Sequence, residues 1–491
     1  MILTAHHSVD TRAVETDSRS PIGSGVLSAA GSVVATTLLV PFATSATRLR
    51  KLLLAIIILD IPLQIGTHLF WSDELGETGG LGGLEISITT VALLGLYFLW
   101  FVQYISRRER EPLISLRPAL PLALYLIFQA VSLLAAHSPL IGVYEVWLTA
   151  QMLLLFIYLI KWIRTRHDVE FVIRLLLVGF VLEAGIILTL ERGGHNVEIP
   201  GLPGHTLMAD TTEGEEAFSR PGGTFASPNA AGSYLSIMLT LVVGLLLLAR
   251  VHAWYAPVTL MAAGMGLIAL LLTYSRGGWL GFSSSTLLLC GAGWRLFRLG
   301  RKIMMVGALV ALFVSLLSDT PLSRRLLESD EGSAHSRIAL NKLAIAMIEN
   351  QPLVGVGVNN FTANVREYAT QESMGEWLYT VHNKYLLVWS EAGLGGLLAY
   401  LWFLASSLNR GWQCWKCKHA PYSPLALTFL CGIASLMICD LFEPDRGRPL
   451  MQLLIVLAAV IGAIHRCTPA AVNGRPAAAV RVKTVSRRRF S

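Results

Sequence analysis

Long apolar runs separated by shorter polar segments recur along nearly the whole chain. About twelve of them approach or reach the roughly 17–25 residues that a membrane-spanning helix needs. They cover residues 52–70, 85–104, 118–137, 143–160, 169–190, 228–249, 254–273, 279–294, 303–318, 383–408, 423–441 and 449–465. A weaker run at 24–43, rich in Gly, Ala, Ser and Thr, either crosses as well or lies on the membrane surface. The pattern predicts an all-α, polytopic transmembrane helical bundle of about twelve spans, or thirteen if the weaker run crosses.

The longest polar segment, residues 319–380, has a helical pattern of its own. Within residues 334–350 several apolar residues fall at helical spacings, and Pro352, Gly355 and Gly357 then break the pattern. These apolar residues are Leu340, Leu343, Ala344, Met347 and Ile348. We predict a partly helical loop domain whose amphipathic helix lies over the membrane surface as a lid or cavity wall.

The basic residues orient the spans. Most Lys and Arg residues lie in alternate loops, which the positive-inside rule places in the cytoplasm. The opposite loops, on the far side, are 71–84, 191–227, 274–278, 319–380 and 442–448. The predicted layout is a cytoplasmic or interfacial segment 1–51, a first transmembrane part 52–318, the loop domain 319–380, C-terminal transmembrane helices 381–466, and a basic cytoplasmic tail 467–491.

Composition supports a membrane protein and excludes an ordinary soluble one. Hydrophobic residues make up 54% and charged residues 14% of the chain, whereas soluble domains carry about 25% charge. The six cysteines show no disulfide framework, and Cys414 and Cys417 form a Cys-x-x-Cys pair without a second pair, which disfavours a zinc or redox site. The polar N-terminus, residues 1–21, lacks the layout of a signal peptide.

Several arginines lie in far-side loops, against the charge bias of that face: Arg220, Arg276, Arg337, Arg446 and Arg448. A single arginine at a membrane edge often only extends its charged end to lipid phosphate. Arg276 fits that interpretation least, because it lies between two spans and is followed by two glycines that allow close approach of a ligand or backbone. Several guanidinium groups at one depth would bind a diphosphate.

For Arg446 we favour a structural role over a catalytic one. Glu443 and Asp445 lie beside it in the sequence and are its expected ion-pair partners.

His382 lies where the long polar loop meets an apolar span, with Asn383 and Lys384 directly after it. Ionisable groups at a membrane edge are costly unless they have a task, and neutral imidazole is the usual general base near neutral pH. A histidine there can also serve only as a hydrogen-bonding residue of the interface. His335 and His382 are far apart in sequence, and no Asp-x-Asp or His-x-x-x-His pair faces outward, so a metal mechanism is disfavoured.

Taken together and in order, four segments between residues 220 and 396 resemble the O-antigen ligase and O-antigen polymerase superfamily of bacterial membrane glycosyltransferases. They are Arg220-Pro-Gly-Gly-Thr-Phe with Pro228-Asn229; Thr273-Tyr274-Ser-Arg276-Gly-Gly; Arg337 with Pro352-Leu-Val-Gly355-Val-Gly357 and Phe361; and His382-Asn383 with Glu391-Ala-Gly393-Leu-Gly395. The flanking helices match in general character.

The resemblance implies a GT-C-like enzyme of the bacterial inner membrane with its site facing the periplasm. The donor would be a glycan on undecaprenyl diphosphate and the acceptor a saccharide or lipid-saccharide hydroxyl, with no nucleotide, cofactor or metal. In this scheme Arg220 and Arg276 hold the diphosphate, His382 is the general base, and transfer is inverting. The substrate-binding candidates are Arg337, Asn383, Asn229, Lys384 and Tyr274. The expected partners are membrane lipids and these substrates, without nucleic acid and with the oligomeric state open.

Two enzymes share this chemistry. One is a ligase that moves a finished glycan to lipid A-core or a similar acceptor, which we favour slightly; the other is a polymerase that joins lipid-linked repeat units. The non-enzymatic alternative is a flippase or transporter of lipid-linked oligosaccharides. A transporter is expected to show inverted repeats with broken helices near mid-membrane, whereas the sequence shows no internal repeat and its polar features crowd one membrane edge.

Overall fold

A computed structural model describes residues 47–106, 115–193, 196–198, 206–211, 219–225, 227–248, 256–297, 331–369, 379–417 and 422–467. The chain divides into two units, Met1–Leu52 and Leu53–Ser491. In the first unit only residues 47–52 are described, and they are helical. The second unit holds all the other described residues. The possible span at 24–43, the span at 303–318 and the basic tail from residue 468 lie outside the described residues.

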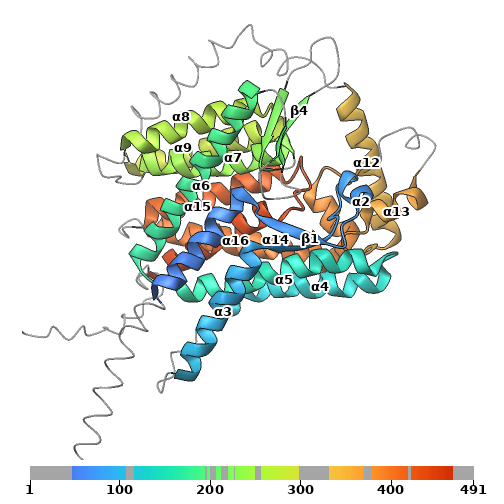
Figure 1. The fold of residues 1–491 in the computed structure, drawn as a ribbon, viewed down its shortest axis with the longest axis horizontal. Helices are drawn as coiled ribbons and strands as arrows, with labels where there is room; N and C mark the ends of the chain where they lie inside the picture. The colour runs from blue at the N-terminus through green and yellow to red at the C-terminus, as the bar shows by residue number, and fades with distance from the viewer. Residues whose placement is uncertain are drawn as a thin grey trace, which may run out of the picture. The chain divides into compact units, whose positions relative to one another are not determined.

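Long helices dominate the second unit, as Figure 1 shows. They are α3 (Ile88–Ser106), α4 (Leu120–Ser132) with 3-10 turns at Arg117–Ala119 and Leu133–Ala135, α5 (Pro139–Trp162), α6 (Arg166–Gly193), α7 (Pro228–Leu248), α8 (Ala256–Leu272), α9 (Arg276–Phe297), α14 (Lys384–Lys416), α15 (Ser423–Cys439) and α16 (Arg448–Cys467). Seven spans within the described residues are long and apolar enough to cross a membrane, and α8 and α15 are shorter apolar helices. The protein is therefore an integral membrane protein with a mostly helical fold.

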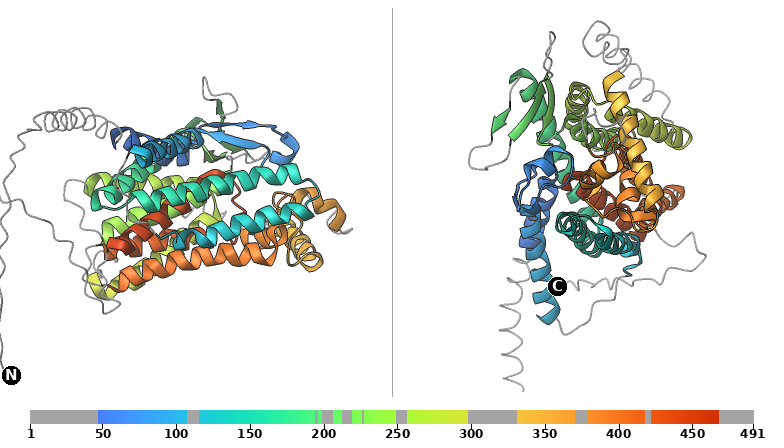
Figure 2. Two further views of the ribbon diagram at one scale, coloured as in Figure 1. Left: turned by 90° about the horizontal axis from the view of Figure 1, so that it is seen from below. Right: turned by 90° about the vertical axis from the view of Figure 1, so that its right-hand side faces the viewer.

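Helix α7 is the most enclosed of these helices and packs against α8, α9 and α15. Small polar side chains join it to its neighbours, with 2.6 Å between the hydroxyls of Ser236 and Ser435 and 2.7 Å between those of Thr240 and Ser285. Small residues allow helices to approach closely where lipid supplies no hydrophobic driving force between them. Figure 2 shows α4, α5 and α14 running side by side next to this group.

Two small antiparallel sheets correct the all-α expectation. Strand β1 (Gly66–Leu69) pairs with β2 (Leu84–Ser87), and a short helix, α2 (Asp73–Glu77), lies between them in sequence. Strands β3 (Val197–Glu198), β4 (Thr206–Thr211) and β5 (Ser219–Gly223) form the second sheet, in that order.

The first sheet shortens the predicted span 52–70, whose helix ends at residue 63. The carboxylate of Asp60 accepts the backbone N–H of Ile65 at 2.7 Å, and Gln64 takes a left-handed conformation with φ of 52°. Such a conformation cannot continue a right-handed helix. The apolar run therefore passes from helix into strand, and its last residue, Phe70, is exposed.

The amphipathic helix predicted in the long loop is confirmed. It is α12 (Glu331–Asn350), and all five of the apolar residues predicted for its inner face are buried. Four of them, all but Ile348, form a small core with Val356, Phe361, Val381 and Leu387, so α12 packs on the short helix α13 (Phe361–Tyr368) and on the start of α14.

Helix α14 is broken at Gly393, which has φ of 68° and ψ of −177°. The loop at 352–357 supplies the hydrogen bonds that the break removes. The backbone N–H groups of Val356 and Gly357 donate to the carbonyls of Ser390 and Glu391 at 2.8 and 3.1 Å, and Leu394 donates to Pro352 at 2.9 Å. The glycines of this loop and of α14 therefore serve close backbone packing and satisfy buried peptide groups.

Candidate active site

Several helix ends meet at one end of the bundle. The backbone N–H of Lys384, at the start of α14, donates to the carbonyl of Asp440 after α15 at 2.8 Å. The following loop reaches α9, because a Cβ atom added to Gly277 would lie 3.3 Å from Cβ of Phe442. The predicted residues His382 and Arg276 therefore flank the same loop, residues 440–447.

His382 is packed between two side chains. Its Nδ1 lies 3.7 Å from Oε2 of Glu443, and its ring stacks on Tyr379 with centroids 5.3 Å apart. The two side chains of the ion pair are only 20% and 13% exposed, and Nδ1 has no hydrogen-bond partner among the described residues. The imidazole thus faces a carboxylate in a largely enclosed place.

Tyr379 is itself held by the loop between β1 and β2. The backbone N–H of Thr380 donates to the carbonyl of Thr78 at 3.0 Å, and a side chain on Gly79, whose φ is 83°, would strike the Tyr379 ring. Burial, followed by the charge of Glu443, raises the pKa of Tyr379 to about 12. Tyr379 therefore remains protonated at neutral pH, and its uncharged ring stacks on the imidazole of His382.

The two residues after His382 make contacts within the protein. The side chain of Asn383 caps α14 by accepting the backbone N–H groups of Tyr385 and Leu386, both at 3.0 Å. Nζ of Lys384 donates to the carbonyl of Asp445 at 3.1 Å. Both residues fix the start of α14 against the 440–447 loop.

Arg220 extends from β5 to the connection between α8 and α9. Its Nη2 donates to Oδ1 of Asn229 at 3.1 Å and to the carbonyl of Thr273 at 3.3 Å. Since Asn229 lies in the first turn of α7, the contacts join Arg220 to the starts of both α7 and α9.

The glycines that follow Arg220, Gly222 and Gly223, are explained by the close packing around them. Gly223 has φ of 60°, and a Cβ atom there would overlap the carboxylate of Glu183. That buried carboxylate accepts the backbone N–H of Thr224 at 3.0 Å and its hydroxyl at 2.8 Å. The Arg-Pro-Gly-Gly-Thr segment is thereby tied to α6, which fixes the strand that carries Arg220.

Arg276 is the first residue of α9 and its side chain is exposed. The sequence predicted a turn at 275–278 before a span at 279–294, whereas the helix already begins at Arg276 because the hydroxyl of Ser275 accepts the N–H of Gly278 at 3.2 Å. A Cβ atom on Gly278 would lie 2.8 Å from the carbonyl oxygen of Gly232 in α7. The glycine thus lets α9 lie against α7 beside Arg276.

Two other predicted binding residues lie on neighbouring elements. Tyr274, two residues before α9, is 9% exposed and has a left-handed backbone with φ of 51°. Arg337 lies near the start of α12 and is half-buried.

Arg446 forms buried ion pairs, as its predicted structural role requires, but with partners other than the expected Glu443 and Asp445. Nη1 donates to Oε2 of Glu145 at 2.7 Å and Nη2 to Oε1 of Glu391 at 2.6 Å, instead of pairing with Glu443 or Asp445. The partners come from α5 and α14, far away in sequence. Burial lowers the pKa of Arg446, but the two carboxylates outweigh it and raise the pKa above its ordinary value.

Arg448 repeats this arrangement two residues later. Its Nη1 donates to the carboxylate of Asp60 at 2.7 Å and its Nε to Glu85 at 2.6 Å, while the amide of Gln452 accepts from Nη1 at 2.8 Å. Through ion pairs with four carboxylates, those of Glu145, Glu391, Asp60 and Glu85, the two arginines anchor the 440–447 loop and the start of α16.

The loop also contains an acidic side chain that sequence reasoning did not connect with His382. Glu443 was expected to pair with Arg446, and only the packing of α14 beside α15 brings it to the imidazole. Its neighbour Asp445 is partly buried, and desolvation, with the charges of Glu443 and Asp440, raises the pKa of Asp445 well above its usual range. Of the carboxylates in this loop, Glu443 is the one that lies within 4 Å of the candidate base, at 3.7 Å.

A small buried cavity of about 30 Å³ lies next to these groups. Its lining includes Lys384, Asp440, Asp445 and Arg446, and the volume is enough for a single water molecule. In the part of the chain that the structure describes, no group of three or more His, Cys, Asp or Glu side chains is arranged to hold a metal ion.

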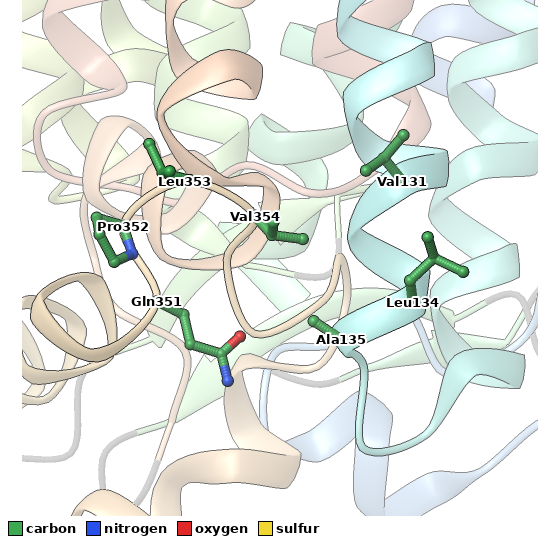
Figure 3. Close-up of a pocket in the computed structure, with 7 residues that line it drawn as sticks. All are labelled: Val131, Leu134, Ala135, Gln351, Pro352, Leu353 and Val354. Carbon is green, nitrogen blue, oxygen red and sulfur yellow. The ribbon is translucent and has the colours of Figure 1, made fainter.

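A larger groove of about 410 Å³ has no charged residue in its lining and is almost entirely apolar (Figure 3). Its lining comes from the end of α4 and from the loop that bridges the break in α14. The lining residues are Val131, Leu134, Ala135, Gln351, Pro352, Leu353 and Val354.

The structure is that of a helical integral membrane protein in which Arg220, Arg276 and His382 lie near the starts of α7, α9 and α14, at the same end of the bundle. Residues 260–401, from α8 into α14, match the family model described as O-antigen ligase. The match supports the superfamily that the motifs predicted, the O-antigen ligases and polymerases, which are membrane glycosyltransferase-like enzymes. The search of curated proteins found no match for the chain.

Proposed function

We propose that this protein transfers a glycan from undecaprenyl diphosphate to a sugar hydroxyl at the periplasmic face of a bacterial inner membrane, without a metal and with inversion. We propose the ligase type, with lipid A-core or a similar acceptor. One observation carries the proposal most strongly: His382 contacts Glu443 and the residue after Arg276 contacts Phe442, so both residues lie next to the 440–447 loop, within the segment that matches the family.

The charge at this end of the bundle supports binding of a diphosphate. Arg276 is the first residue of α9, and Arg220, on β5, bonds to Asn229 in the first turn of α7. Backbone N–H groups and the helix dipole favour an anion at such helix starts. Guanidinium groups bind phosphate oxygens bidentately, and here they would also neutralise the charge that develops on the leaving group.

The proposed reaction is a single displacement. Nε2 of His382 takes the proton of the acceptor hydroxyl as its oxygen forms a bond to the anomeric carbon. The bond from that carbon to the phosphate oxygen breaks, and its electron pair leaves with undecaprenyl diphosphate. The imidazolium later returns the proton to solvent. Attack opposite the leaving group inverts the anomeric centre.

The remaining predicted residues receive supporting roles in this proposal. Asn229 orients Arg220 through their hydrogen bond, and Asn383 and Lys384 fix the start of α14 beside His382. Tyr274 adjoins the arginine site, and Arg337 would bind donor phosphate or an anionic acceptor from α12.

The variant His382→Ala tests the general base. We expect it to lower transfer at least about 100-fold, the lower range for removal of a general base, while donor binding and thermal unfolding stay unchanged. Transfer is measured with lipid-linked glycan and lipid A-core, both extracted from a deletion strain of the source bacterium. Full activity of the variant would remove His382 from the reaction.

The acceptor is tested separately. Wild-type protein is incubated with lipid-linked repeat units alone, and then with lipid A-core added. We expect product only in the second mixture. A ladder of longer lipid-linked chains in the first mixture would contradict the ligase type and favour a polymerase.

A further inference from the structure

The carboxylate of Glu443 faces the imidazole of His382, and neither side chain is more than 20% exposed. We infer that Glu443 is a positioning residue that holds the candidate base in its reactive tautomer and stabilises the imidazolium it forms. The inference rests on the proposed function of His382, and it extends that function by assigning a second residue to proton transfer.

The charges around Glu443 leave it available for this role. Arg446, its nearest basic neighbour in sequence, directs both terminal nitrogens to Glu145 and Glu391. Lys384 directs its Nζ to the carbonyl of Asp445. Within the described ranges, the ion pair formed by Glu443 is therefore the one with His382.

The backbone of Glu443 is held on both sides, which a positioning residue requires. Its N–H donates to the carbonyl of Cys439 at 3.1 Å, and the carbonyl of Asp440 accepts the N–H of Lys384 at 2.8 Å. Three residues beyond, the two salt bridges of Arg446 fix the loop to α5 and α14. The loop that carries Glu443 and the helix that begins just after His382 are thus one rigid assembly.

The chemistry depends on the nitrogen that Glu443 faces. A carboxylate near Nδ1 favours the tautomer with the proton on that nitrogen, which leaves Nε2 bare to accept a proton from the acceptor hydroxyl. Once Nε2 is protonated, the ring is a cation beside an anion in an enclosed site, where the attraction is stronger than in water. Both effects speed proton removal and neither affects binding of the lipid donor.

The test compares Glu443→Gln with Glu443→Asp. We expect Glu443→Gln to lower kcat at least about tenfold, a typical loss when the partner that orients a histidine is removed. The donor KM should stay within about twofold of the wild-type value and the unfolding temperature should stay unchanged. Glu443→Asp, which keeps the charge, should retain more activity. The donor and acceptor are the extracted lipid-linked glycan and lipid A-core, and Glu367→Gln on the exposed face of α13 is the matched control.

Wild-type kcat in Glu443→Gln would overturn the inference, as would a lower kcat accompanied by a lower unfolding temperature or a raised donor KM. His382→Ala measured in parallel separates the two proposals. If His382→Ala is inactive and Glu443→Gln is fully active, only the positioning role fails. If His382→Ala is active, the proposed function fails with it.

Discussion

Arg220 and Arg276 lie at the same end of the bundle in different surroundings. Arg220 is partly buried, and its guanidinium is oriented by Asn229 and by the carbonyl of Thr273. Arg276 is exposed at the start of α9. Because Arg276 is the more exposed of the two, replacing it should disturb the fold less than replacing Arg220, which makes it the cleaner probe of the proposed diphosphate site.

We expect Arg276→Lys to lower kcat/KM for the lipid-linked donor at least about tenfold, which corresponds to about 1.4 kcal/mol. Lysine keeps the charge but cannot make the bidentate contact of a guanidinium. Donor titration and thermal unfolding check the result. The matched control is Arg174→Lys, an exposed arginine on α6. Wild-type donor use by Arg276→Lys would count against a bidentate phosphate contact.

At the scale of elements, the break in α14 and the loop at 352–357 depend on each other. Gly393 has a backbone conformation that is essentially restricted to glycine, and its Cα lies against the backbone of Leu353. The peptide groups that the break frees are bonded to the loop. Gly355 and Gly357 in the loop and Gly393 in α14 therefore form one packed contact, which we call the structural joint.

We expect Gly393→Ala to lower the stability of the protein by about 2 kcal/mol or more, since it combines backbone strain with a clash against Leu353. Thermal unfolding in detergent measures the loss. Gly264→Ala in α8 is the control, because a Cβ atom there meets nothing within 4 Å and alanine favours a helix. Equal unfolding temperatures for the two variants would show that the joint is not structural.

The same scale shows which elements were predictable. The inner face of α12 follows from a local repeat of apolar residues, and the structure buries all of them. The end of the first predicted span was missed because β1 continues the apolar run, so hydropathy alone does not separate helix from strand. The start of α9 was misplaced because glycines suggested a turn where Ser275 caps a helix.

At the scale of the whole molecule, the α15–α16 connection is fixed by buried ion pairs from distant parts of the chain. Arg446 joins α5 and α14, and Arg448 joins Asp60 and Glu85 to α16. Pairings of this kind depend on the finished packing of many helices. The sequence therefore identified Arg446 as structural but indicated the wrong partners, and it could not predict that Glu443 faces His382.

We expect Arg446→Ala to destabilise the protein by about 3–5 kcal/mol, because it leaves Glu145 and Glu391 buried without a counter-charge. Unfolding temperature and yield of folded protein measure the effect. Combining Arg446→Met with Glu145→Gln and Glu391→Gln should recover part of the loss. In contrast, Arg166→Ala, which removes an exposed pair with Glu170, should change stability little. A wild-type unfolding temperature for Arg446→Ala would contradict the proposed anchoring.

The break at Gly393 also bears on how the chain is built into a membrane. Within lipid, a carbonyl or N–H group without a partner costs several kcal/mol. The carbonyls of Ser390 and Glu391 find partners in residues 356 and 357, which are synthesised before α14. The backbone of helix α14 is thus not satisfied by the helix alone, and the preceding loop must dock against it before the break is fully hydrogen-bonded. Because His382 lies just before α14, its final position depends on the same docking step.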